Sequence, residues 1–108
     1  MAAAFDTFQD ADVPTTDTDE YTASSNTAVV SLILSNKTAA TVNITVKLVR
    51  SGVTVTLVKD APIVVGSAIE IIENKPPILK SGDKVQCACT TGGASAVDAI
   101  GTVLTGLP

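Results

Sequence analysis

The stretch that decides the fold runs from Thr27 to Lys59 and reads TAVVSLILSNKTAATVNITVKLVRSGVTVTLVK. From Val42 to Leu48, apolar side chains fall at every second position, with polar side chains between them. This is the pattern of a β-strand with one buried face. Ser51 and Gly52 then offer a two-residue reversal, after which the alternation resumes, so a β-hairpin is predicted. Its register pairs Arg50 with Val53, Leu48 with Val55 and Val46 with Leu57.

Short strands with turns between them are expected through the rest of the chain. Val, Ile and Thr dominate from Thr27 onward, and turn residues such as Ser81-Gly82-Asp83 and Thr91-Gly92-Gly93 recur about every 8 to 12 residues. No window long enough for a helix shows helical periodicity. Residues 27–108 are therefore predicted to form an all-β antiparallel sandwich of about seven or eight strands, Ig-like or jelly-roll-like.

Two details of this sandwich follow from single residues. In the strand that begins at Thr27, alternation places Val30, Leu32 and Leu34 on one face and Val29 and Ile33 on the other. Further on, Pro62 has no N–H to donate to a ladder. We therefore expect a break at residues 60–62, followed by a short fourth strand at residues 63–65 that lies at an edge or a bulge.

The first 26 residues differ in composition from the rest. Six acidic residues and no Lys or Arg occur in residues 1–20, a side-chain charge of −6 against +2 for the remainder. Because like charges repel, we interpret residues 1–26 as an extended N-terminal arm outside the sandwich. The candidate assembly contacts are Phe5 and Phe8 as apolar anchors, with Asp10 and Asp12 meeting Lys or Arg on a neighbouring chain. A frayed terminus with two incidental aromatic residues is the alternative.

No constellation of residues for catalysis or for holding a cofactor is evident. The chain has no His, and Asp98, the acid in the middle of a predicted strand, has no predicted partner. Cys87 and Cys89 lie two apart on one face, which does not favour a mutual disulfide, and a metal site would need further ligands. We interpret them as buried thiols and expect neither an enzyme nor a metal or cofactor site.

Contacts with nucleic acid or membrane are not expected either. There is no basic cluster with aromatic residues beside it, and no apolar run long enough to span a membrane. The N-terminus lacks the basic and apolar regions of a secretory signal, so we expect no secretory signal.

Between Ser25 and Leu104 the chain resembles a class of small β-sandwich structural proteins of bacteriophage particles. The elements that carry the resemblance are residues 26–30, 35–38, 42–50, 58–63, 79–85 and 95–100.

The resemblance implies a non-enzymatic virion protein, made in the host cytoplasm, that decorates or cements a capsid in many copies. The alternative is a neck, tail or fibre module of the same particle. Its partners would be copies of itself and other virion proteins. A carbohydrate- or receptor-binding module normally presents an aromatic platform, and the predicted sandwich has none. A cytosolic chaperone or adaptor remains a third reading.

Overall fold

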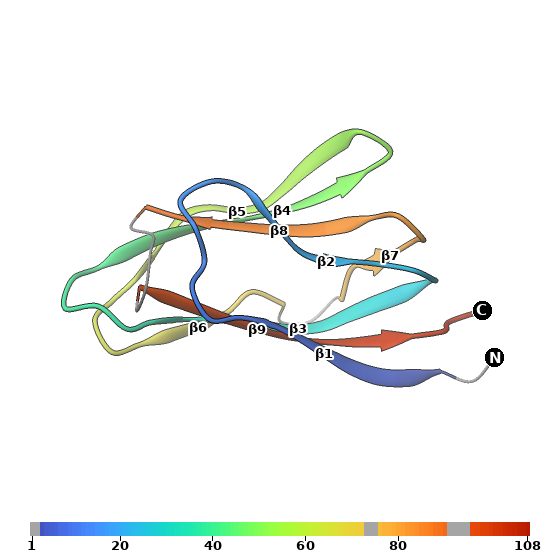
Figure 1. The fold of residues 1–108 in the computed structure, drawn as a ribbon, viewed down its shortest axis with the longest axis horizontal. Coiled ribbons are helices and arrows are strands. Elements are labelled where there is room, and N and C mark those ends of the chain that lie inside the picture. The colour runs from blue at the N-terminus through green and yellow to red at the C-terminus, as the bar shows by residue number, and fades with distance from the viewer. Residues whose placement is uncertain (1–2, 73–75, 91–95) are drawn as a thin grey trace.

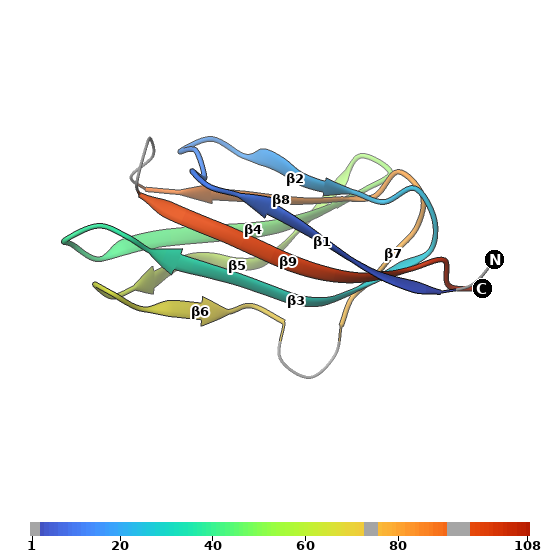
Figure 2. The same ribbon diagram turned by 60° about the horizontal axis from the view of Figure 1, so that its bottom comes forward.

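The computed structural model describes residues 3–72, 76–90 and 96–108, and every regular element in these ranges is a β-strand. The strands form two antiparallel sheets that pack face to face (Figures 1 and 2). The prediction of an all-β antiparallel sandwich is thus confirmed. In chain order the strands are β1 (Ala4–Asp10), β2 (Thr18–Thr22), β3 (Thr27–Asn36), β4 (Val42–Arg50), β5 (Val53–Ile63), β6 (Ala68–Glu70), β7 (Ile78–Leu79), β8 (Lys84–Cys89) and β9 (Val97–Thr105).

The order of the strands is that of a jelly roll. Sheet A has the order β1-β9-β3-β6, with β7 pairing another part of β3, and sheet B has the order β2-β8-β4-β5. Consecutive strands change sheet, except for the β4–β5 hairpin within sheet B and the β6 and β7 segments beside β3 in sheet A. Strands β6 and β7 both pair with β3 and together take the place of one strand. With these two counted as one, eight strands form two four-stranded sheets in the jelly-roll order.

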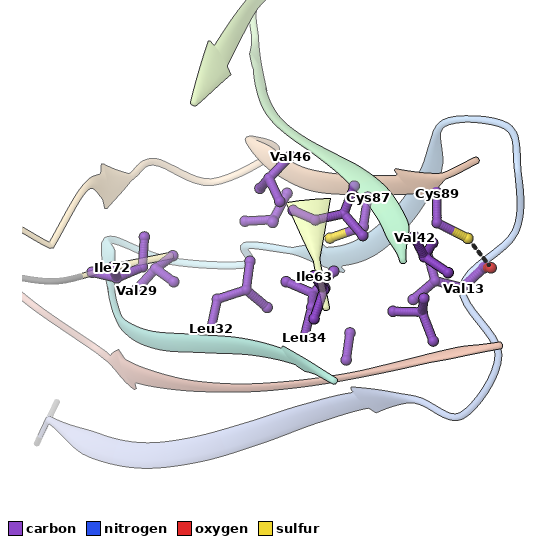
Figure 3. Close-up of a cluster of buried hydrophobic side chains, with 14 of the residues drawn as sticks. Val13, Val29, Leu32, Leu34, Val42, Val46, Ile63, Ile72, Cys87 and Cys89 are labelled. Carbon is purple, nitrogen blue, oxygen red and sulfur yellow. Dashed lines mark hydrogen bonds between the residues drawn. The ribbon is translucent and has the colours of Figure 1, made fainter. Parts of the chain in front are cut away.

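The core between the sheets is aliphatic, because the inward positions of the alternating strands carry branched side chains. On β4 the inward residues Val42, Ile44 and Val46 are fully buried. Cys87 and Cys89 on β8 lie beside them as small apolar groups, neither is in a disulfide, and Sγ of Cys89 donates to the carbonyl oxygen of Val13 at 3.1 Å (Figure 3). The interpretation of both cysteines as buried thiols is confirmed.

The β4–β5 hairpin follows the predicted register at its tip and departs from it further down. Arg50 pairs with Val53 and Leu48 with Val55, as the two-residue turn requires. Val46, however, pairs with Val58 rather than Leu57, because a β-bulge inserts one extra residue into β5.

The predicted break at residues 60–62 is wrong, since β5 continues through Pro62 to Ile63. A second irregularity in the β4–β5 pairing includes Asp60, whose φ is +52° and whose N–H donates to Oγ1 of Thr45 at 3.1 Å. Pro62 is tolerated because β5 is an edge strand of sheet B. The missing N–H of Pro62 predicted a position at an edge or a bulge. The strand predicted at residues 63–65 is therefore the end of β5 and the start of a loop.

A bulge also changes which side chains of β3 face the core. The pairing of β3 with β9 shifts between Val29 and Ser31. Val29 consequently joins Leu32 and Leu34 in the core, whereas Val30 is only partly buried. The prediction that Val30 shares the inner face with these leucines is wrong, because strict alternation does not survive an inserted residue.

The segment predicted as an arm, residues 1–26, is part of the sandwich over its described residues 3–26. Strand β1 pairs with β9 at one edge of sheet A, and β2 pairs with β8 at the same side of sheet B (Figure 2). The loop between them supplies Val13, which is fully buried and whose N–H donates to the carbonyl of Val97 at 2.9 Å. The acidic segment is thus part of the jelly roll. The reversal predicted at Thr91-Gly92-Gly93 lies outside the described residues.

Candidate assembly surfaces

The structure directs the four predicted assembly contacts to different environments. Phe8 points inward from β1 and lies over Gly101, its partner on β9. Its ring also contacts that of Tyr21 on β2, with centroids 5.2 Å apart. This pair of rings joins the two sheets at the β1–β2 side, so Phe8 is a packing residue rather than an anchor for a neighbour.

The absence of a side chain at position 101 is what admits the Phe8 ring. A Cβ atom added to Gly101 would lie 2.2 Å from Cζ of Phe8, far inside van der Waals contact. We expect Gly101→Ala to displace the ring and lower the free energy of unfolding by about 1 to 2 kcal/mol, measured by urea denaturation. In a Phe8→Ala background the same substitution should cost much less. Equal costs in both backgrounds would contradict this contact.

Asp10 faces another carboxyl group rather than a base. It projects from β1 toward Glu20 on β2, and the two carboxyl groups form a hydrogen bond. Burial, together with this hydrogen bond and the charge of Asp10, raises the pKa of Glu20 to about 8. Burial also raises the pKa of the nearby Cys87 thiol, with smaller contributions from Glu20 and Asp10. The Glu20 carboxyl group is therefore mostly protonated at neutral pH.

Asp12 is held within its own chain. Nζ of Lys37 lies 3.6 Å from its carboxylate and 2.7 Å from that of Asp98. The same ammonium group donates to the carbonyl oxygen of Ala11 at 3.1 Å. Asp98, the acid that sequence alone left without a partner, is thus one half of an ion pair between β9 and the loop after β3.

Phe5 is the predicted apolar contact that faces solvent. It lies near the start of β1, directly opposite Leu104 on β9, and is 72% exposed. Alternation along β1 explains the difference between the two phenylalanines, because residues three apart on a strand point to opposite faces. Phe5 is therefore free to contact another molecule.

A surface that the sequence analysis missed lies at the tip of the β4–β5 hairpin. The hairpin extends away from the rest of sheet B (Figure 1). Val53 and Val55 sit on it and are 63% and 53% exposed. A groove of about 240 Å³ separates this tip from the segment that carries β7. We call it the hairpin groove, and its lining includes Leu48, Arg50, Val55, Pro77, Ile78 and Asp83.

Arg50 links the hairpin to the β7 segment and to Asp83 at the end of this groove. Its Nε donates to the carboxylate of Asp83 at 2.6 Å, and its Nη2 donates to the carbonyl oxygen of Ile78. Asp83 is buried, and the N–H of Lys80 together with the Arg50 side chain keeps the pKa of its carboxyl group low. The groove is thus an ordered, mostly apolar hollow with a charged rim.

The sequence did contain a signal for this surface. The predicted pairing of Leu48 with Val55 put two apolar side chains on the inner face near the hairpin tip. The sequence did not show how little of the hairpin tip sheet A covers, since β6 and β7 have only three and two residues. Because these segments are so short, the inner face of the hairpin tip is left partly uncovered.

A second hollow, on the outer face of sheet B, is polar. It has a volume of about 430 Å³, and its lining includes Asn43, Thr45, Lys47 and Lys59. Lys47 is already paired, since its Nζ lies 2.8 Å from the carboxylate of Asp17. No aromatic side chain lines this hollow, so it lacks the platform on which sugar rings usually stack.

The described ranges contain neither a cluster of metal ligands nor a membrane-spanning helix. There, no three His, Cys, Asp or Glu side chains come together as a set of metal ligands. In the same ranges, no helix is long and apolar enough to span a bilayer. No protein-family model matches the chain, and no curated protein matches it in sequence.

Proposed function

We propose that this chain is a non-enzymatic structural protein of a bacteriophage particle, present in many copies as a capsid decoration or cement subunit. The observation that carries the proposal is the apolar hairpin tip, where Val53, Val55 and Ile78 are exposed around an ordered groove. A protein that works alone gains nothing from exposing such side chains, whereas a subunit buries them on assembly.

The rest of the molecule supports the proposal. Three lysines hold acidic side chains of other segments in four ion pairs, and both cysteines are buried inside the core. A compact domain with few groups left for chemistry suits a scaffold that has to persist on a particle. The ion pairs are Lys37 with Asp12 and Asp98, Lys47 with Asp17, and Lys84 with Asp19.

The fold and the sequence resemblance point in the same direction. Jelly rolls occur in viral capsid proteins, although lectins and cupins share them, so the fold alone is an analogy. The resemblance to small phage virion proteins extends from Ser25 to Leu104, which includes β3, β4, β5 and β8 and most of β9. A location at the neck or tail would use the same surfaces with a different symmetry.

Incorporation into particles tests this function directly. We expect the chain to co-purify with intact virions in many copies, and Val55→Asp to reduce its occupancy at least about tenfold, because it puts a charge into an apolar contact. Val64→Asp is the matched control, since Val64 is 57% exposed but lies in the β5–β6 loop, away from the hairpin tip.

Quantitative mass spectrometry of purified virions would count the copies, and cryo-electron microscopy would place them. A uniform distribution over the shell would support a decoration subunit, and density at one vertex a neck or tail protein. If the chain is missing from virions, or if it binds a free sugar or receptor fragment instead, the proposal is wrong.

A further inference from the structure

The hairpin groove is shaped and lined for one bulky apolar side chain. Its walls are the side chains of Leu48 and Val55 on the hairpin and of Pro77 and Ile78 beside β7. At about 240 Å³ it has room for an aromatic ring. Because Arg50 bonds to both Asp83 and the backbone of Ile78, the two walls are held at a fixed separation. A ligand would therefore not have to order the groove before binding.

Phe5 is a side chain of the kind that this groove fits. Of the three aromatic residues in the chain, Phe8 and Tyr21 are committed to each other, whereas Phe5 is 72% exposed. It lies on β1, an edge strand whose backbone is fixed by a continuous ladder to β9 from Ala4 to Asp10. An aromatic ring on a fixed strand loses little entropy on docking, which is the usual property of an interface anchor.

Charges beside the two surfaces are complementary. The residue after Phe5 is Asp6, which is exposed, and β1 carries Asp6 and Asp10 but no Lys or Arg. At the groove, Arg50 lines the wall, and Lys80 lies on the turn that carries Asp83, so two basic groups accompany one acid. An approaching β1 would therefore bring negative charge to a rim with a net positive charge.

We propose that the hairpin groove of one copy of this protein binds Phe5 on β1 of a second copy. The inference rests on the proposed function, which requires many copies to assemble, and it names the partner of the same surface. Within one copy, the start of β1 and the tip of the hairpin lie at the same end of the sandwich (Figure 1). Two copies could thus exchange this contact reciprocally about a twofold axis, or a ring of copies could repeat it.

Self-association of the purified full-length chain is the first test. Sedimentation equilibrium should show the wild-type protein forming dimers or larger oligomers, more weakly at high salt. Phe5→Ala and Val55→Asp should each weaken association at least about tenfold while leaving thermal unfolding nearly unchanged. The control Val64→Asp should associate like the wild type.

Mixing the two defective variants gives the sharper test. The Phe5→Ala chain keeps an intact groove, and the Val55→Asp chain keeps an intact Phe5. Native mass spectrometry of a mixture in which one variant is labelled with ¹⁵N should therefore show mixed dimers and few dimers of either variant alone. Mixed dimers no more abundant than the others, or a Phe5→Ala chain that associates normally, would overturn the inference.

The outcome separates this inference from the proposed function. A wild-type chain that stays monomeric in solution but occupies virions in many separate positions would refute the contact between copies and leave the function standing. A chain that self-associates through Phe5 but never enters virions would support the contact between copies and refute the proposed function.

Discussion

Replacing Val46 by Asp should leave the chain without a cooperative unfolding transition. Val46 is fully buried at the centre of β4, between Cys87 on β8 and Val58 on β5. A carboxylate there has no base within the apolar core, so burying it should cost several kcal/mol. That is a large part of the stability of about 5 to 15 kcal/mol expected for a small domain. Urea denaturation followed by circular dichroism would measure the loss.

Val55→Asp is the matched control for this substitution. Val55 lies in the same hairpin and on the same face of sheet B, but it is 53% exposed. Its carboxylate would remain hydrated, and the change in the free energy of unfolding should stay within about 1 kcal/mol. If Val46→Asp unfolds with the same midpoint as Val55→Asp, the assignment of Val46 to the core is wrong.

The hairpin from Val42 to Val58 could be predicted well because local chemistry decides it. Alternation predicted the inner face of β4. The turn at Ser51 and Gly52, both with positive φ, set the pairing of the four residue pairs nearest to it. The prediction went wrong where β5 takes in an extra residue. The position of a bulge depends on how the strand bends to pack on the opposite sheet, and no single residue of the sequence indicates where that bend lies.

Strand β1 and the packing of the N-terminal segment onto the sandwich were missed because the stabilising partners are distant in sequence. Repulsion among the acids argued for an arm, but three of them meet lysines from elsewhere in the fold. Strand β1 also gains a full ladder with β9, the last strand of the chain. The net charge of the segment indicates neither these ion pairs nor the pairing of β1 with β9. The three contacts are Asp12 with Lys37, Asp17 with Lys47, and Asp19 with Lys84.

The candidate site was recovered only in part for a similar reason. Sequence could nominate Phe5 and Phe8 as aromatic residues in an unusual place, but not say which one pointed outward. That depends on β1 being a strand and on Gly101 lying opposite Phe8. The hairpin groove depends on how far β7 extends along β3, a property of the packed sheets.

Raising the pH should weaken the β1–β2 side of the sandwich through Glu20. Its pKa is about 8 in the folded protein against an ordinary value of 4.5, so between these values the folded state binds more protons than the unfolded state. The free energy of unfolding therefore falls as the pH rises from about 4.5 to about 8. Because the pair is partly exposed, screening reduces the effect, and we expect a loss of about 2 kcal/mol between pH 5 and pH 8.5.

Glu20→Gln should abolish most of this dependence. A glutamine amide can donate to Asp10 at any pH, as the protonated carboxyl group does, so the variant should match the wild type at pH 5 and exceed it by about 2 kcal/mol at pH 8.5. The neighbouring substitution Asp19→Asn is the control. Asp19 is exposed, and its hydrogen bonds to Gln86 and Lys84 lower its pKa, so its titration lies below this window and the loss should persist. Urea denaturation at the two pH values would measure these free energies of unfolding. If the wild type and Glu20→Gln lose the same stability between pH 5 and pH 8.5, the titration of Glu20 is not coupled to folding.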